Sequence, residues 1–292
     1  MKIGLCQVDG KMPNLALMKL SAWHKAQGDE VAWFSPLEQF DRVYAAKVFD
    51  FSPDNAYLPP SAIKGGTGYN LTTNLPPDVE AMVPDYTLYP ACDYALGFTT
   101  RGCIRNCSFC VVPRKEGKLR VVGDLHDFWC GQRKAVLLDN NLTAAPIAHF
   151  REIIAQAHDL GVAVDFNQGL DIRLLTDEQA ALLARVKLAK QIHFAWDNMR
   201  DEAAVRRGIE RLHAHMPLSR VMFYVLIGFD STPAEDYYRV MELRALGVDP
   251  FVMPFVKRDP YQRAFTRWVN HKAIFKSVDW HDYHGRPLEV IA

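Results

Sequence analysis

Five apolar segments recur at nearly equal spacing through the C-terminal two thirds of the chain. They begin near Ala135, Val162, Gln191, Arg220 and Pro250. Their starts lie about 27 to 30 residues apart, each gap has room for a helix, and a further strand is expected at 94–98. Parallel strands need crossovers of this length, and such crossovers are right-handed. The spacing therefore predicts an α/β fold with a partial (β/α)6 barrel that is open on one side.

Capping signals mark where helices of this series begin and end. The motifs that start at Thr176 and Thr232 are capping boxes, and Pro233 occupies the first helical position of the second. Gly161 and Gly247 stand where a helix C-terminus needs a left-handed residue. These signals support the alternation of strands and helices.

The region 1–85 predicts a smaller unit of a related kind. Apolar strands are expected at 3–8, 31–34 and 43–49. A helix capped by Asn14 is expected to end at Gly28, so the order of elements predicts a small, mostly parallel, Rossmann-like sheet. The stretch 59–84 is rich in Pro, Gly and Asn and reads as a connection. Its Gly-Gly-Thr-Gly run fits either a turn or a phosphate-binding loop.

Three parts are expected along the chain. They are a Rossmann-like N-terminal domain with its linker at 1–85, the partial barrel at 86–256 and a C-terminal helical extension at 257–292. The extension interleaves basic and aromatic residues, a pattern typical of a nucleic-acid surface or of an amphipathic helix. We favour the helix, which would close the barrel and bury Phe265, Trp268 and Val269.

Charge and hydropathy limit the class of protein. The formal net charge is zero, with 34 basic and 34 acidic residues, so no overall field attracts nucleic acid or anionic membrane. No apolar run approaches the roughly 18 residues that a membrane-spanning helix needs. The chain starts without a secretory signal and its cysteines are unevenly clustered. We therefore expect a cytoplasmic protein rather than a disulfide framework.

Three of the six cysteines form a C-x3-C-x2-C run of Cys103, Cys107 and Cys110. One short loop can direct all three sulfurs at one point. Thiolates are soft ligands that select iron–sulfur clusters, zinc or Cu(I). Because closed structural sites use four protein ligands, three leave a position open for chemistry. A structural zinc site with a distant fourth ligand is the alternative.

The remaining cysteines, Cys6, Cys92 and Cys130, admit two interpretations. They could form a second cluster, or they could be isolated thiols that pack as small hydrophobic residues. The position of Cys6 inside an apolar strand favours the second interpretation.

Polar residues follow each later barrel strand in the sequence. They are Asp139, Asn140 and Asn141; Asn167, Gln168, Asp171 and Arg173; Asp197 and Asn198; Gly228 and Asp230; and Lys257 and Arg258. Chemistry in such barrels takes place at the C-terminal strand ends, where the loops converge. We expect these residues to share one face with the cysteine loop.

The cysteine run after a first strand, followed by a βα repeat, resembles the radical S-adenosylmethionine (radical SAM) superfamily over roughly 86–254. Phe109 occupies the aromatic position that this superfamily favours before the last cysteine. The segment CIRNCSFCVVPRKEG is most similar to methylthiotransferases and cobalamin-domain radical SAM enzymes. The segment around Gly228 resembles their fifth-strand glycine motif.

The resemblance implies a cofactor and a reaction. Cys103, Cys107 and Cys110 would bind a [4Fe-4S] cluster, and S-adenosyl-L-methionine (SAM) would chelate its fourth iron. An electron from a reductant such as flavodoxin or ferredoxin would cleave SAM to methionine and a 5′-deoxyadenosyl radical, which abstracts hydrogen from the substrate. The protein would position the cofactor and exclude solvent.

The resemblance also implies cofactor contacts. The residues expected to make them are Phe109, Asn140, Asn141, Arg173, Asp197 and Gly228. An Asp-Asn-Asn segment replaces the usual Gly-Gly-Glu, so Asn140 or Asn141 is expected to hold the methionine amine. Arg173 would pair with the SAM carboxylate through its planar fork, and Asp197 would accept from the ribose hydroxyls. No catalytic residue on the substrate side is assigned.

Departures from the family pattern shape the functional hypothesis. The Asp-x-His-x-x-Gly signature that supplies a cobalt ligand is absent, so we expect an enzyme that works without cobalamin. The N-terminal part also lacks the second cysteine triplet of methylthiotransferases. A cobalamin-dependent methyltransferase, a methylthiotransferase-like enzyme that modifies RNA or protein, and a non-enzymatic electron-transfer protein stay open as alternatives. The substrate, whether nucleoside, RNA or peptide, is left open too.

Overall fold

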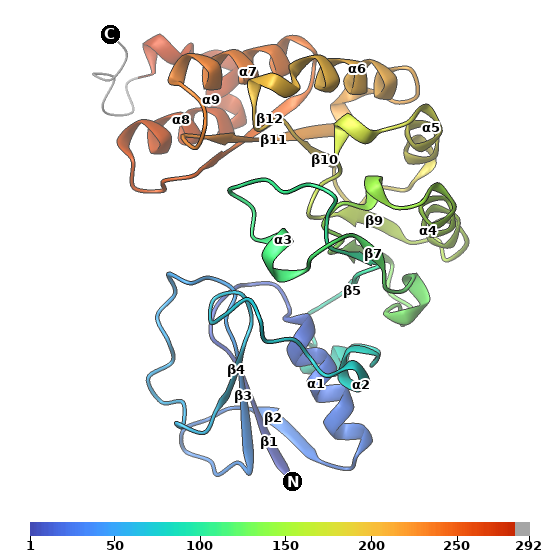
Figure 1. Cartoon of the computed structure of the whole chain (residues 1–292), viewed down its shortest axis with the longest axis vertical. Coiled ribbons are helices and arrows are strands. Elements are labelled where there is room, and N and C mark those ends of the chain that lie inside the picture. The colour runs from blue at the N-terminus through green and yellow to red at the C-terminus, as the bar shows by residue number, and fades with distance from the viewer. Residues whose placement is uncertain (284–292) are drawn as a thin grey trace.

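The computed structural model describes residues 1–283 as an α/β protein with mostly parallel sheets, which confirms the predicted class (Figure 1). The N-terminal unit, coloured blue, lies at one end, and the later helices and strands form a curved layer at the other. The loop that carries the clustered cysteines lies on the inner side of this curve.

The structure assigns the following bounds. The strands are β1 (Lys2–Gln7), β2 (Glu30–Trp33), β3 (Arg42–Ala46), β4 (Ile63–Gly65), β5 (Ala95–Gly97), β6 (Thr100–Arg101), β7 (Arg120–Val121), β8 (Lys134–Leu137), β9 (Ala163–Phe166), β10 (Ile192–Ala195), β11 (Val221–Ile227) and β12 (Asp249–Pro254). The helices are α1 (Leu15–Ala26), α2 (Pro77–Glu80), α3 (Val112–Lys115), α4 (Ile147–Asp159), α5 (Asp177–Arg185), α6 (Glu202–His213), α7 (Pro233–Ala245), α8 (Pro260–Asn270) and α9 (Lys272–Ser277).

The N-terminal unit contains a four-stranded parallel sheet in the order β2-β1-β3-β4. Helix α1 begins where the Asn14 side chain accepts the backbone N–H of Leu17 at 3.2 Å. Gly28, with φ of +80°, follows the end of the helix. The predicted cap, the end of the helix and the parallel arrangement are therefore confirmed.

Strand β3 is shorter than the predicted 43–49. It ends at Ala46 because the Asp9 carboxylate accepts the N–H groups of Val48 and Phe49, at 2.7 and 2.9 Å, in place of a strand partner. The stretch expected to be a plain connection, 59–84, contains β4 and α2. Each has only three or four residues, too few to show a periodic pattern in the sequence.

The Gly-Gly-Thr-Gly run packs closely on the end of β3. A Cβ added at Gly66 would overlap the carbonyl oxygen of Lys47, and one at Gly68 would lie 2.7 Å from that of Phe49. Gly66 has φ of +96°, and the N–H of Gly68 donates to the Lys47 carbonyl at 2.9 Å. These contacts explain the glycines by backbone approach, which supports the interpretation as a turn.

All six strands expected for the barrel are present, but they form two sheets. The orders are β5-β8-β9 and β10-β11-β12, and both sheets are parallel. Gly169, with φ of +86°, turns the chain after β9 so that the N–H of Leu170 donates to the carbonyl of His193 at 2.8 Å. A residue beyond β9 thus takes the place of a strand partner, and a continuous six-stranded ladder does not form among the described residues.

The first of these sheets joins the two halves of the molecule. Ala95 and Ala135 face the main core, whereas Leu96 and Val136, which alternate with them, belong to the core of the N-terminal unit. The sheet is therefore buried on both faces, as parallel sheets usually are.

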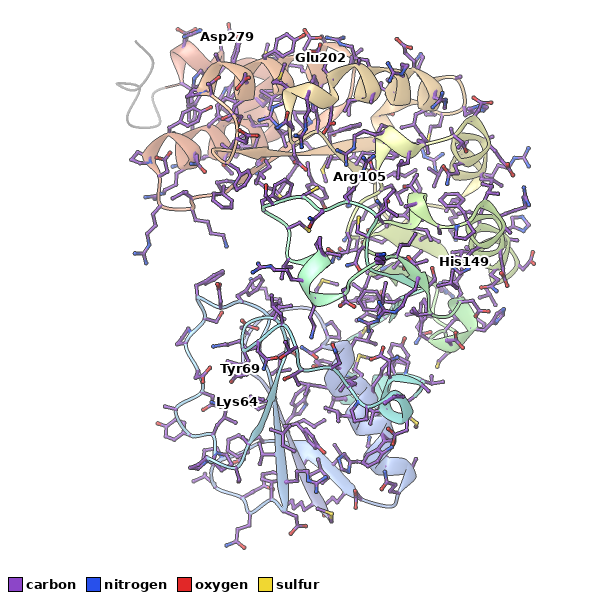
Figure 2. The ribbon with its side chains drawn as sticks, in the orientation of Figure 1. Lys64, Tyr69, Arg105, His149, Glu202 and Asp279 are labelled. Atoms are coloured by element: carbon purple, nitrogen blue, oxygen red, sulfur yellow. The ribbon has the colours of Figure 1, made fainter. Side chains whose placement is uncertain are left out.

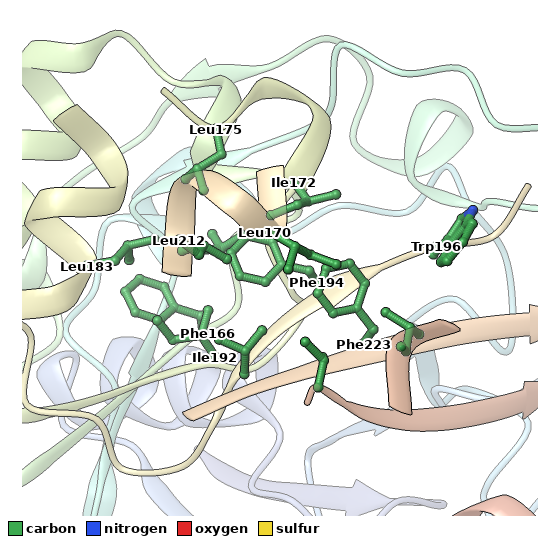
Figure 3. Packing of buried hydrophobic residues seen from close by; sticks show 14 of the residues in the cluster. Phe166, Leu170, Ile172, Leu175, Leu183, Ile192, Phe194, Trp196, Leu212 and Phe223 are labelled. Carbon is green, nitrogen blue, oxygen red and sulfur yellow. The ribbon is translucent and has the colours of Figure 1, made fainter. Parts of the chain in front are cut away.

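The main core lies between the strands and the outer helices. Figure 3 shows Phe194 and Phe223, from β10 and β11, close to Ile172 and Leu212. The two phenylalanine rings stack with centroids 5.6 Å apart, and all four side chains are buried. These layers hold the strand ends that carry the candidate site.

The predicted signals at helix ends are confirmed. The capping boxes at Thr176 and Thr232 are both formed, with Pro233 in the first turn of α7. Gly161 and Gly247 have φ of +65° and +76°.

The C-terminal helices complete the main core. Phe265, Trp268 and Val269 of α8 are at most 1% exposed, which confirms the prediction of an amphipathic helix. The last part of the extension predicted at 257–292, from 284 onward, lies outside the described residues. Among those described, the helices include none with the length and apolar character needed to cross a membrane.

Candidate functional site

The cysteine loop is closed at its base by a short antiparallel ladder between β6 and β7, which the sequence did not predict. Next to the ladder, the N–H of Cys103 donates to the carbonyl of Gly117 at 3.2 Å. Gly102 has φ of +81°, and a Cβ there would overlap the carbonyl of Lys118. Glycine is therefore required immediately before the first cysteine, where the two sides of the loop meet.

Asp139, which follows β8, anchors the start of this loop. Its carboxylate is buried and accepts four hydrogen bonds, from the backbone N–H and the hydroxyl of both Thr99 and Thr100, at 2.5 to 3.1 Å. The His149 ring, on α4, hydrogen-bonds the Thr99 hydroxyl at 3.2 Å. Burial raises the pKa of Asp139, and the hydrogen bonds from the two threonines act in the opposite direction. Four hydrogen bonds to one buried side chain hold the approach to the cysteines in place.

Asn140 and Asn141, the two residues after Asp139, also hydrogen-bond the cysteine loop. Asn140 Oδ1 accepts the N–H of Gly102 at 2.9 Å, and Asn141 Nδ2 donates to the sulfur of Cys103 at 3.4 Å. Asn141 is 4% exposed, and its Oδ1 has no hydrogen-bond partner within the described chain. The structure thus places both predicted asparagines against the cysteine loop.

The three clustered cysteines are free, half-buried thiols. Burial raises the pKa of Cys107 and of Cys110 above the ordinary thiol value, although Arg173 acts in the opposite direction on Cys107. Over residues 1–283 no three His, Cys, Asp or Glu side chains already converge to hold a metal ion.

A network of ions ties the loop to the end of β9. Arg105, labelled in Figure 2, donates from Nε to Asp171 at 2.9 Å. Arg173 binds both oxygens of Asp171, at 2.7 and 3.0 Å, and also Asp201 at 2.8 Å. Burial alone would raise the pKa of Asp171, but the ion pairs with Arg173 and Arg105 outweigh it and lower that pKa.

One small cleft brings residues from several strand ends together. It is lined by Cys107 and Phe109 of the loop, Arg173 after β9, Asp197 after β10, and Phe229 and Asp230 after β11. Burial raises the pKa of Asp197, whose Oδ1 accepts the N–H of Leu226 at 3.0 Å. Four of the predicted site residues therefore share this cleft.

Aromatic rings border one side of the cleft. The rings of Phe109 and Phe229 meet edge to face at 5.5 Å, and Phe229 meets Phe255 in the same manner at 4.8 Å. All three are more than a third exposed. Gly228, which was expected to contact the cofactor, has φ of +73° and packs against the side chain of Gln262. Its neighbour Phe229 lines the cleft.

The N-terminal unit also contacts the cysteine loop, through an ion pair and a hydrogen bond. Arg101 pairs with Glu80 of α2 at 2.7 Å and with Glu116 of the loop at 3.2 Å. Lys115 of α3 donates to the carbonyl of Thr73 at 2.6 Å. The loop is thus held between both halves of the molecule.

The other three cysteines are free thiols with different surroundings. Cys6 is buried and accepts a hydrogen bond from Asn55 Nδ2 at 3.6 Å. Cys92 donates to the carbonyl of Tyr94 at 3.2 Å, and Cys130 is exposed.

Sequence reasoning missed Thr99, Thr100, His149, Arg101 and Glu80 as parts of the site. Their partners lie 15 to 50 positions away in the chain, so no local pattern marks them. The sequence offered one usable signal, which is the pair of threonines, Thr99 and Thr100, directly before the cysteine loop.

Comparison with protein-family models found no match, and neither did comparison with curated proteins.

Proposed function

We propose that this chain is a radical SAM enzyme in which Cys103, Cys107 and Cys110 hold a [4Fe-4S] cluster and SAM binds beside them. The observation that carries the proposal is the shared cleft, where the cysteine loop meets Arg173 and Asp197 from two different strand ends. In parallel α/β folds, ligands bind at such carboxyl ends.

The residues present fit the cluster. Three thiols on one short loop supply the soft donors that iron–sulfur clusters use. Asn141 Oδ1 is a buried acceptor without a partner in the described chain, and it is open to a donor from a ligand. When bound, the reduced cluster would supply the electron that cleaves SAM and starts hydrogen abstraction from substrate.

The chain's own side chains would bind and orient SAM. Asn141 Oδ1 would accept from the ammonium group of the methionine moiety, and the Asp197 carboxylate would accept from ribose hydroxyls. Arg173 has three of its five N–H groups engaged by Asp171 and Asp201, so two remain for the SAM carboxylate. Its guanidinium is therefore held rigidly before the ligand arrives.

The cleft must open to admit a nucleotide. Its volume is about 60 Å³, well below the roughly 300 Å³ of a typical small-molecule site. Phe109 and Phe229 come from two loops that meet across the cleft, so outward movement of either loop would enlarge it. Once SAM is bound, the same rings would shield it from water on that side.

Anaerobic reconstitution with iron and sulfide tests the proposal. With SAM and dithionite or flavodoxin, we expect about four iron and four sulfide per chain and formation of 5′-deoxyadenosine, detected by mass spectrometry. A stable cluster that never yields 5′-deoxyadenosine would favour an electron-transfer protein, and bound zinc in place of iron would favour a structural site. Either result overturns the proposal.

A corrinoid that co-purifies when cobalamin is supplied would overturn the expected independence from cobalamin. The same assay, repeated with nucleosides, RNA oligonucleotides and peptides, would identify the substrate class.

A further inference from the structure

We infer that Asn141 is a positioning residue that donates its amide N–H to a cluster-ligating sulfur and thereby raises the reduction potential of the cluster. The inference rests on the proposed function, because it concerns the cluster that Cys103 would help to hold. It adds a role on the protein side of the sulfur, distinct from the contact of Asn141 Oδ1 with SAM.

Among the three clustered cysteines, Cys103 is the one whose sulfur receives a side-chain hydrogen bond within the described residues. The donor is Asn141 Nδ2 at 3.4 Å, and a second donor is the backbone N–H of Arg105 at 3.3 Å. The bond from Asn141 can be removed by substitution, whereas the bond from the backbone cannot.

The surrounding contacts hold Asn141 in register with Cys103. Asp139 binds Thr99 and Thr100, Asn140 binds Gly102, and Asn141 then reaches Cys103. Successive residues after β8 thus contact successive parts of the cysteine loop. Asn141 is 4% exposed, so water cannot easily replace its amide as the donor.

The electrostatic consequence has a definite sign. Reduction adds negative charge to the cluster and its sulfurs, and an N–H dipole directed at a sulfur stabilises that charge. Hydrogen bonds to the sulfurs are among the features that set the potential of iron–sulfur clusters. Loss of this donor should therefore make the reduced state less favourable and the midpoint potential more negative.

Asn141→Leu tests the inference, because leucine has a similar shape and no donor. Asn141→Ala serves if the leucine variant does not fold, as judged by circular dichroism of the metal-free protein. The control is Asn270→Leu, which removes an asparagine amide that bonds the backbone of Val252 and makes no contact with the cysteine loop. The measurement is a redox titration of the reconstituted cluster followed by electron paramagnetic resonance.

We expect a more negative midpoint potential for the Asn141 variants, and the wild-type potential for the cluster of the Asn270 variant. Unchanged potentials in the Asn141 variants, or an equal shift in Asn270→Leu, would overturn the inference. A wild-type protein that assembles no [4Fe-4S] cluster would instead overturn the proposed function. The two failures are thus distinguishable.

Discussion

Arg101 of the cysteine loop and Glu80 of the N-terminal unit form an ion pair at 2.7 Å across the boundary between the two halves of the molecule. Lys19 of α1 also pairs with Glu80, at 3.2 Å. The N-terminal unit therefore helps to fix the position of the loop that carries Cys103, Cys107 and Cys110, although none of these three cysteines belongs to that unit.

Loss of this ion pair should loosen the loop more than it destabilises the fold. Because the Glu80 side chain is 38% exposed, we expect Glu80→Gln to lower the free energy of unfolding by only about 0.5 kcal/mol. Amide hydrogen exchange over 102–117 should increase. Asp93→Asn, which breaks the exposed pair with Lys134, is the control and should leave that exchange as in the wild type. Equal exchange in both variants would argue against the coupling.

Asp139 should be a major determinant of stability. Asp139→Ala leaves two backbone N–H groups and two hydroxyls of buried threonines without their acceptor. We expect a loss of about 3 kcal/mol or more in the free energy of unfolding, measured by urea denaturation. Asp171→Ala, whose carboxylate contacts arginines rather than buried threonines, provides the comparison and should cost less. A loss under about 1 kcal/mol for Asp139→Ala would contradict this account.

Cys107→Ala should abolish cluster assembly and SAM cleavage, because two remaining thiolates cannot hold the cluster. The measurements are iron and sulfide content and the yield of 5′-deoxyadenosine after anaerobic reconstitution. Cys130→Ala removes an exposed cysteine outside the loop and should match the wild type in all of them. Full iron content in Cys107→Ala would remove Cys107 from the ligand set.

Arg173→Ala should weaken SAM binding roughly tenfold or more, since a charge-assisted contact to a carboxylate is lost. Binding to the reconstituted protein can be followed by equilibrium dialysis. Arg206 makes a similar network with Glu202 and Glu242 on α6 and α7, and none of these three residues lines the cleft, so Arg206→Ala is a matched control. An affinity that is unchanged in Arg173→Ala would exclude Arg173 from the SAM site.

His193 should make stability depend on pH. Burial lowers its pKa below the ordinary value of about 6.5; Asp165 opposes this shift and Lys190 reinforces it. The ring also hydrogen-bonds the Tyr224 hydroxyl at 3.2 Å. Because the folded state favours the neutral ring, the stabilisation is complete above pH 6.5 and is lost as the pH falls below that value.

Urea denaturation between pH 7.5 and 5.5 checks this expectation. The free energy of unfolding should fall more steeply with decreasing pH in the wild type than in His193→Gln. His158 is exposed on α4, so His158→Gln should keep the wild-type slope. Identical slopes in all three proteins would show that His193 does not titrate differently on unfolding.

Local patterns predicted much of the fold. The cap at Asn14, the capping boxes at Thr176 and Thr232, and the turns at Gly161 and Gly247 are all formed, because each depends on residues within one turn of a helix. The split between β9 and β10 was not predictable. It depends on where Leu170 finds a hydrogen-bond partner, and that partner, His193, is on another segment of the chain.

The candidate site divides in a similar way. Spacing in the sequence marked the cysteines and Phe109 as candidates, and the position of Arg173 and Asp197 after strands predicted that they share a face with the cysteine loop. In the structure these two residues line one cleft with Cys107 and Phe109. The sequence did not show that Arg173 is already bound by Asp171 and Asp201, because ion pairs between loops produce no periodic pattern in the sequence.

The sequence by itself determined the order of the main strands and helices, the helix ends and the three clustered thiols, because these follow from local backbone preferences and short spacings. The tertiary structure alone decided which groups hold the cysteine loop. Asp139, Asn140 and Asn141 reach residues about 40 positions earlier in the chain, and Glu80 reaches Arg101 from a different core. Such hydrogen bonds depend on how the sheets stack, and stacking is set by the burial of apolar faces across the whole molecule.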